Sequence, residues 1–263
     1  MRPPWVILSN RAFRKHFSSL KRGDFILGIL ALKQGEEFLY SDLYARNILA
    51  YPSLLSQHLA RSKCFQAAVF QSYMIPETRV IRDRHDLIRA LNEYGAKDIQ
   101  KVVTKQNRFN CGLGIHLWEN IETLYNTASF GNLPYPFVLQ PFVPQVIDIR
   151  VVWLGDYIEA YARKNPYNFR NNLFFGGEAT SYHLSPEELD LCREIMARGQ
   201  FPYAHLDLMK TAEGACYLAE INLRGGLKGA LIKQEEYTKK INDLHQKALQ
   251  EFLKAHPQAV LKE

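Results

Sequence analysis

The chain has 263 residues, 47% of them hydrophobic, so it can bury about three quarters of the surface that its unfolded form exposes, and disorder is not expected. The longest apolar runs, at 137–142 and 149–154, end well before the roughly 18 residues that a membrane span needs, so no transmembrane helix is expected. The net charge of +6 and the pI near 9.0 come from Lys and Arg spread along the chain, so anionic small molecules explain the excess as well as a nucleic acid does.

The start of the chain and its cysteines indicate the compartment. The first apolar run, at 5–8, is too short for the core of a signal peptide. The four cysteines, Cys64, Cys111, Cys192 and Cys216, are far apart and form no C-x-x-C pair, so we expect free thiols and neither a zinc site nor a disulfide framework. A cytoplasmic protein is therefore expected.

Residues 1–60 are expected to form a small α/β domain. Short apolar or alternating runs at 5–8, 25–30 and 37–40 are separated by polar and glycine-containing stretches. This pattern predicts strands joined by helices or turns.

Residues 61–136 are expected to form a central domain. A helical pattern of apolar residues over 52–73 leads into this region and stops before Pro76. A turn-rich stretch at 131–136 then places a domain boundary at its end. The elements predicted in between are a strand at 78–81, a helix at 84–93, a strand at 100–105 and a helix at 119–129.

Residues 137–263 are expected to form a C-terminal domain. The sequence S-P-E-E at 185–188 predicts a capped helix start. The elements predicted here are strands at 137–142, 147–154 and 157–163, an irregular segment to 180, a helix at 185–198, and strands at 203–209 and 215–221 joined by a turn.

A glycine-containing loop follows the strand predicted at 100–105. Lys105 precedes Gly112 and Gly114 in K-Q-N-R-F-N-C-G-L-G-I. Glycines let backbone N–H groups approach phosphate oxygens, and a lysine supplies a positive charge to them. The loop is therefore a candidate phosphate-binding loop, and the alternative is an ordinary glycine turn between two strands of a hairpin.

Three oxygen-bearing side chains lie on the last two predicted strands. Glu220 and Asn222 are two residues apart, so their side chains leave one face of a strand, and Asp207 on the neighbouring strand can join them. Magnesium prefers such oxygen ligands and keeps open positions for phosphates. The alternative is a hairpin whose polar side chains face water.

Four ordered motifs resemble those of the RimK-type carboxylate–amine (glutamate) ligases of the ATP-grasp superfamily. They are the glycine loop, V-L-Q-P-F-V-P-Q-V-I-D-I-R-V-V-W-L-G-D, F-R-N-N-L-F-F-G-G-E-A, and the Asp207, Glu220, Asn222 series. R-S-K-C-F-Q-A and I-P-E-T-R-V also look like the start of that family's central region, so the resemblance covers 61–229. It implies an α+β ATP-grasp fold, in which two α+β domains clasp ATP behind a small α/β N-terminal domain.

The resemblance also implies roles for individual residues. Asp207, Glu220 and Asn222 match the family's magnesium ligands. Asp148 matches a ribose-side acidic residue, although a charge paired with Arg150 is the alternative. The other implied contacts are Lys63, Lys105, Gly112 and Gly114 to the phosphates; Gln140, Pro141, Phe142 and Val143 to the adenine; Arg163, Arg170 and Asn172 to the phosphates and the reacting acyl phosphate; and Arg150 and Arg224 to the substrates, with a surface role as the alternative for Arg224.

The implied activity is ATP-dependent formation of an amide or peptide bond through an acyl phosphate. The implied cofactors are ATP and Mg²⁺, with Mn²⁺ as a substitute. The implied partners are a small-molecule or peptide carboxylate and an amine acceptor; no membrane and no nucleic acid are expected, and a homo-oligomer stays open.

Three departures from the family pattern keep other functions open. Phe109 stands where the phosphate loop usually has its first glycine, His205 replaces a small residue before the metal-ligand aspartate, and the N-terminal domain is short. One alternative is an ATP-binding sensor or scaffold without catalysis. Another, suggested by the basic residues at 11–22, is an RNA- or protein-binding module.

Overall fold

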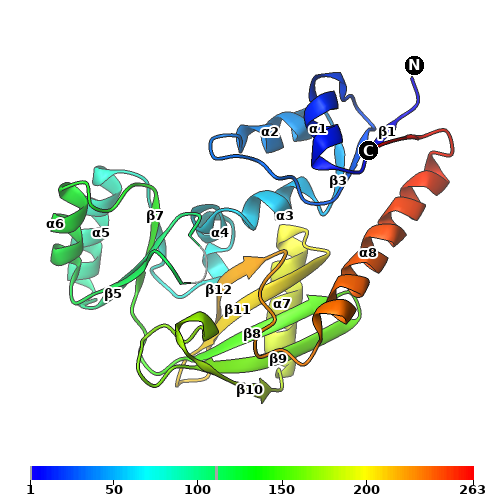
Figure 1. Ribbon diagram of the computed structural model, residues 1–263. Coiled ribbons are helices and arrows are strands. Elements are labelled where there is room, and N and C mark those ends of the chain that lie inside the picture. The colour runs from blue at the N-terminus through cyan, green and yellow to red at the C-terminus, as the bar shows by residue number, and fades with distance from the viewer. Residues whose placement is uncertain (1, 110–111) are drawn as a thin grey trace.

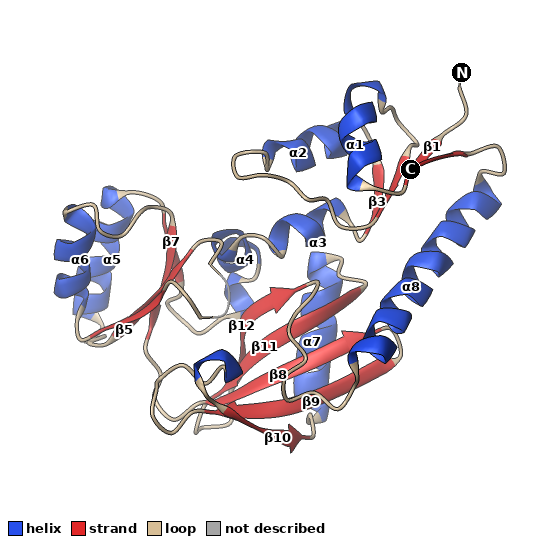
Figure 2. Ribbon diagram, viewed as in Figure 1, coloured by secondary structure: helices blue, strands red, loops and turns tan. Residues whose placement is uncertain are grey.

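The computed structural model describes residues 2–109 and 112–263, and these form three β-sheets with helices packed on them (Figure 1). Figure 2 shows that the helices α5 and α6 lie beside the sheet that contains β5 and β7, while α7 lies behind the largest sheet. None of the described helices is both long and apolar enough to cross a membrane.

The N-terminal sheet is parallel and has the order β13-β1-β2-β3. The predicted strand at 37–40 is wrong, because these residues begin a helix. Leu39, Tyr40 and Leu43 are its buried residues, which is the spacing of one helical face. The elements are β1 (Trp5–Ile7), α1 (Asn10–His16), η1 (Phe17–Ser19), β2 (Phe25–Leu27), α2 (Phe38–Ala45), β3 (Leu49–Tyr51) and β13 (Val260–Lys262).

The end of the chain returns to this sheet. Helix α8 (Gln234–Ala255) leads to β13, which pairs with β1, so the two termini lie close together in Figure 1. Phe252 of α8 stacks on Phe25 of β2 with ring centroids 4.7 Å apart. Residues 137–263 were expected to belong wholly to the C-terminal domain, but their last strand, β13, is part of the N-terminal sheet.

The helix expected over 52–73 is broken into α3 (Leu54–Leu59), α4 (Lys63–Val69) and the turn η2 (Gln71–Tyr73). Ser62 starts α4 by accepting a hydrogen bond from the Phe65 N–H, at 3.1 Å, as an N-cap does. The Gln66 amide then exchanges two hydrogen bonds, of 2.8 and 2.9 Å, with the backbone of Ile221. Helix α4 is thereby fixed to the strand that carries the predicted metal ligands.

The middle sheet is antiparallel, with the order β4-β7-β5-β6. Its core includes Leu87, Tyr94, Leu124 and Phe137, all fully buried. The predicted boundary at 136 cuts this sheet, because β7 pairs with β4 and β5 although its residues were expected in the C-terminal domain. The elements are β4 (Arg79–Ile81), α5 (Arg84–Ala96), β5 (Val102–Gln106), β6 (Ile115–Trp118), α6 (Ile121–Ser129) and β7 (Phe137–Pro141).

The C-terminal sheet is antiparallel, with the order β10-β9-β8-β11-β12, and α7 covers one of its faces. The predicted capped helix start is confirmed, since Ser185 and Glu188 form a reciprocal capping box. The elements are β8 (Ile147–Leu154), β9 (Tyr157–Lys164), η3 (Leu173–Phe175), β10 (Glu178–Tyr182), α7 (Pro186–Gly199), β11 (Tyr203–Lys210) and β12 (Cys216–Asn222).

Strand alternation sorts the side chains of this sheet onto two faces. Ile149, Val151, Leu206 and Leu208 point into the core, where they are fully buried. The intervening residues face the other way and are brought side by side by the register, which pairs Asp148 with Arg163, Arg150 with Tyr161 and with Asp207, and Asp207 with Glu220.

Candidate active site

The polar face of the C-terminal sheet forms one wall of a pocket of about 650 Å³. Val103 and Lys105 of β5 and Gln140 of β7 line it from the middle sheet, and Gln57 and Ala60 line it from α3 and its end. Most of the predicted site residues meet here, namely Lys105, Gly112, Gln140, Phe142, Val143, Asp148, Arg150, Arg163, Arg170, Asn172, Asp207, Glu220, Asn222 and Arg224.

The three other predicted residues lie nearby but do not line this pocket. Lys63 lines a smaller neighbouring pocket of about 200 Å³, whose lining also includes Glu220. Pro141 ends β7, and Gly114 lies just before β6. Lys63 therefore reaches the site from the side, through Glu220.

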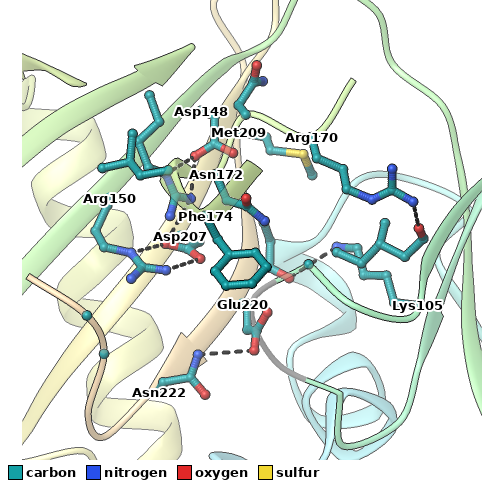
Figure 3. A pocket seen from close by; sticks show the side chains of 18 of the residues that line it. Lys105, Asp148, Arg150, Arg170, Asn172, Phe174, Asp207, Met209, Glu220 and Asn222 are labelled. Atoms are coloured by element: carbon teal, nitrogen blue, oxygen red, sulfur yellow. Dashed lines mark hydrogen bonds and ion pairs between the residues drawn. The ribbon is translucent and has the colours of Figure 1, made fainter. Parts of the chain in front are cut away.

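Asp207 is held between two arginines, and Figure 3 shows its pair with Arg150. The Arg150 guanidinium donates two hydrogen bonds to its carboxylate, at 2.6 and 2.7 Å, and Arg163 Nη2 lies 3.1 Å from Oδ1. Burial opposes ionisation of Asp207, but the two arginines outweigh it and hold the pKa of this carboxyl below its usual range. Arg163 also donates to Asp148, at 2.8 Å. The predicted alternative of an Asp148–Arg150 pair is therefore wrong, because Asp148 pairs with Arg163, which also contacts Asp207.

Glu220 is paired with a cation and an amide. Its Oε1 accepts hydrogen bonds from Lys63 Nζ at 3.0 Å and from Asn222 Nδ2 at 3.1 Å. Lys63 Nζ also donates to the Phe109 carbonyl at 2.6 Å. Lys63 thus joins the candidate metal ligand to the glycine-containing loop.

The donor set fits a magnesium ion by its chemistry. Asp207 and Glu220 are register neighbours, and Asn222 lies two residues further along β12. Among residues 2–109 and 112–263, no group of three or more His, Cys, Asp or Glu is placed to hold a metal. An ion here would therefore need the Asn222 amide oxygen and phosphate oxygens beside the two carboxylates, as magnesium sites with a nucleotide commonly have.

The candidate phosphate loop is the turn of a hairpin, since β5 pairs with β6 and Lys105 lies opposite Ile115. The alternative interpretation, a turn between two strands of a hairpin, thus describes the backbone correctly. Gly112 in this turn also lines the pocket. Gly112 has φ +76°, and a Cβ there would lie 2.2 Å from Asn172 Nδ2, so only glycine fits. Asn110 and Cys111, the latter among the expected free thiols, lie outside the described residues.

The backbone conformation at position 109 does not require a glycine. The left-handed conformation belongs to Arg108, with φ +67°, and the Phe109 side chain is 47% exposed. The Arg108 guanidinium pairs with Glu37 at the start of α2. Contacts to α2 and α4 therefore hold the first part of the loop.

Lys105 lies at the end of β5 that faces the pocket. Its Nζ donates to the Ala219 carbonyl, at 3.2 Å. Burial lowers its pKa to about 8, although the Glu220 charge acts in the opposite direction. Its protonation state can therefore change within the working range of an enzyme.

Arg170 connects the C-terminal sheet region to the middle sheet. Its guanidinium donates to the Ile115 carbonyl of β6 and lies over the Phe169 ring, 4.2 Å from the centroid. Asn172 caps η3 by accepting a hydrogen bond from the Phe175 N–H, at 3.1 Å. Both predicted residues are thus held in place where they line the pocket.

The rest of the pocket lining combines apolar side chains with cations. Among the apolar ones, the Phe142 ring lies 6.5 Å from that of Phe169. Among the cations, Arg61 and Lys228 donate to the carbonyls of Leu32 and Leu173. The apolar lining residues include Ile75, Val103, Phe142, Val143, Val146 and Met209. The lining cations Arg61, Arg224 and Lys228 form no ion pair with a described carboxylate.

Sequence reasoning gave no role to several lining residues. Arg61 stands in the quoted R-S-K-C-F-Q-A motif, and Tyr161 is two residues before Arg163 on β9, so strand alternation could have found it. Ile29, Gln57 and Phe174 also line the pocket. Nothing in the local pattern signals Ile29 or Gln57, because they come from the N-terminal part of the chain.

His205 is buried behind the pocket. Its Nε2 lies 3.0 Å from the Tyr237 hydroxyl of α8, and burial lowers its pKa to about 4, so the ring is neutral at pH 7. A Cβ on Gly225 would lie 2.7 Å from His205 Nδ1. The larger side chain at this position is therefore accommodated by a glycine after β12.

Comparison with known proteins gives one family model, the RimK-like ATP-grasp domain, which matches residues 57–245. A probable alpha-L-glutamate ligase 2 of Hahella chejuensis is 33% identical over 152 residues, covering 55% of this chain and 47% of the relative. The ribosomal protein bS6–L-glutamate ligase of Shigella boydii is 23% identical over 189 residues, covering 68% of this chain and 62% of the relative. The matched stretches thus span about half to three fifths of these relatives.

Solved structures with the same fold have low sequence identity. The D-cycloserine synthetase DcsG superposes with a TM-score of 0.62 at 12% identity, covering 85% of this chain and 83% of that one. The D-alanyl-alanine synthetase A of Vibrio cholerae superposes with a TM-score of 0.58 at 14% identity, covering 86% and 77%. The fold is therefore shared with solved structures of distant sequence.

Proposed function

The chain belongs to the RimK-like ATP-grasp family, and from this we propose that it is an ATP- and magnesium-dependent ligase that joins a carboxylate to an amine. The observation that carries the proposal is the pocket between the middle and C-terminal sheets, where Asp207, Glu220 and Asn222 lie on one face among several cations. An all-oxygen donor set beside cations suits a metal-bound polyphosphate.

ATP would lie in the pocket with its adenine against apolar residues of the lining. Phe142, Val143 and Met209 would contact the base, and the Gln140 region would offer backbone groups to it. Lys105 and Lys63 would then face the phosphates, and Asp148 the ribose. When bound, magnesium supplies positive charge to the phosphate oxygens and would be held by Asp207, Glu220 and Asn222.

The reaction begins when a substrate carboxylate oxygen attacks the γ-phosphorus of ATP and the bond to the β-phosphate oxygen breaks, which gives an acyl phosphate and ADP. An amine then attacks the acyl carbon, phosphate leaves, and the nitrogen loses a proton as the amide forms. The chain contributes position and charge, with Arg163 and Arg170 beside the transferred group.

The part of the pocket that Arg61, Arg224 and Lys228 line is the proposed binding place of the second substrate. Arg61, Arg224 and Lys228 bring positive charge there without a carboxylate partner among the described residues, which suits the carboxylate of an amino acid or peptide. The relatives named above are glutamate ligases, so glutamate is one substrate to test.

The acyl phosphate can be tested directly by trapping with hydroxylamine. Wild-type protein with ATP, Mg²⁺ and a series of carboxylic acids is expected to form a hydroxamate with its acid substrate. Glu220→Ala is expected to reduce the yield by about 100- to 1,000-fold, by analogy with the loss of one stabilising group in other enzymes.

Glu213→Ala is the matched control, because Glu213 is an exposed acid in the turn between β11 and β12. It is expected to keep the wild-type yield. A folded Glu220→Ala variant with a full hydroxamate yield would reject the metal assignment, and amide formation without any trappable intermediate would reject the acyl phosphate.

A further inference from the structure

The Phe174 ring is left open inside the pocket. It lines the cavity, yet the residue is 68% exposed. In Figure 3 the ring lies in the middle of the view, among Asp207, Glu220 and Asn172. The ring makes an edge-to-face contact with Phe175, with centroids 5.5 Å apart. An aromatic ring in such a place exposes apolar surface inside the pocket that Asp207 and Glu220 also line.

The backbone that carries Phe174 is fixed on both sides. Leu173 is buried in the core of the C-terminal sheet region, and its carbonyl accepts a hydrogen bond of 2.9 Å from Lys228. The Phe175 carbonyl accepts one of 2.8 Å from Asn165 Nδ2. Gly176 then ends the turn in the left-handed conformation, with φ +88°. The exposed position of the ring is thus set by its neighbours, which favours a preorganised binding surface.

The turn that carries the ring contacts two cations of the pocket lining. Lys228 donates to the Leu173 carbonyl, and the Arg170 guanidinium lies 5.3 Å from the centroid of the Phe175 ring. A ligand bound beside the Phe174 ring therefore meets positive charge for a carboxylate and an aromatic surface for its remaining part.

On the basis of the proposed function, we propose that Phe174 is a specificity-determining residue and that one of the two joined substrates carries an aromatic or bulky aliphatic side chain that packs on its ring. Apolar surface removed from water on binding supplies the affinity. An acidic side chain gains little there, because a carboxylate placed against an aromatic face is desolvated and meets its negative quadrupole.

The test measures binding and turnover separately. Binding of l-phenylalanine, l-leucine and l-glutamate to the full chain with Mg²⁺ and ADP is measured by calorimetry. ADP release from ATP is measured with the same amino acids, alone and in pairs. Phenylalanine and leucine are expected to bind more tightly than glutamate. Phe174→Ala is expected to weaken their binding roughly tenfold and leave the KM for ATP unchanged, whereas Phe174→Leu keeps most of the affinity.

Phe130→Ala is the control, because Phe130 is an exposed aromatic residue at the end of α6 that does not line the pocket. It is expected to match the wild type in both measurements. Glutamate bound as tightly as phenylalanine and leucine, or an unchanged amino-acid affinity in Phe174→Ala, would overturn the proposal. A raised KM for ATP alone would place the ring against the nucleotide and overturn it too. Absence of ADP release in every mixture would reject the ligase, while the binding data would still decide the role of Phe174.

Discussion

At the scale of single residues, each of the three acids of the pocket already has a cationic partner. Asp148 pairs with Arg163, Asp207 with Arg150, and Glu220 with Lys63. Lys105 differs, because its ammonium contacts a backbone carbonyl and lies in a partly buried position. Bound phosphates would be the negatively charged partner that the Lys105 ammonium group does not have in an ion pair with a described carboxylate.

The pH dependence of ATP use is predicted to report on Lys105. Burial lowers its pKa to about 8, so the side chain is charged below that pH and becomes neutral as the pH rises through it. Since kcat/KM reflects ionisations of the free enzyme, kcat/KM for ATP is expected to fall as the pH rises through about 8. A steady-state pH profile with saturating second substrates measures this.

Lys105→Arg is the matched variant, because a guanidinium keeps its charge throughout that range. Its kcat/KM is expected to be lower at neutral pH, as the shape of the side chain differs, but not to fall near pH 8. A wild-type profile that is flat there, or an arginine variant that keeps the same decline, would contradict the role of Lys105.

Most of the candidate site could be predicted at this scale, and strand alternation explains why. Glu220 and Asn222, two apart on one strand, share a face as expected, and Asp207 joins them through the register. The partners of these residues could not be predicted, because Lys63 reaches Glu220 from a helix 157 positions away in the chain. The pairing of Asp148 with Arg163 instead of Arg150 likewise depends on the β8–β9 register. The roles of all these residues stay predictions.

At the scale of secondary-structure elements, the segment after β12 is fitted closely to β11. A Cβ on Gly225 would lie 2.7 Å from His205 Nδ1 and 3.2 Å from Arg150 Nη1. Tyr237 of α8 holds the other side of the histidine ring. A change at Gly225 therefore acts on Arg150, which holds the Asp207 carboxylate.

Gly225→Ala is predicted to lower the free energy of unfolding by about 1–3 kcal/mol, the usual cost of forcing an added group into a packed site, and to reduce turnover. His205→Ala removes the side chain that the new methyl group meets. Gly225→Ala is therefore expected to lower the free energy of unfolding less in the His205→Ala background than in the wild type. A double-mutant cycle, measured by unfolding in denaturant, tests this. Additive effects of the two changes would contradict this packing.

The elements themselves were predictable where hydrophobic periodicity was regular. The strand predicted at 147–154 and the helix predicted to start at Ser185 agree with the structure. The segment 37–40 was too short to separate a strand from a helical turn. The pattern over 52–73 runs through a break between α3 and α4, where Ser62 caps the second helix. Helix α8 carries Tyr237, Ile241, Leu244, Ala248 and Phe252 at helical spacing, so it was predictable in the same way, although no element was predicted there.

At the scale of the whole molecule, each of the three sheets corresponds to one of the three predicted domains, except that two strands lie in a different sheet from the one expected. Strand β7 joins the middle sheet, and β13 joins the N-terminal one. Both depend on pairing between distant parts of the chain, which local patterns do not encode. The ATP-grasp fold was predictable because four motifs occurred in order, each of which alone has an ordinary structural explanation.

The pocket itself is a property of the whole molecule, since residues of α3, β5, β7, β8, β9, β11 and β12 line it together. A ligase needs this arrangement to hold ATP, an acid and an amine at once. A sensor that only binds ATP needs no second or third substrate. The two functions therefore differ in which compounds ATP consumption requires.

The most direct test is the release of ADP and phosphate from ATP with Mg²⁺, measured across mixtures of carboxylic acids and amino acids with Glu220→Ala as the inactive comparison. We predict release that requires both an acid and an amine and falls at least about 100-fold in Glu220→Ala. Tight ATP binding with no release in any mixture would contradict the ligase and favour a nucleotide-sensing protein.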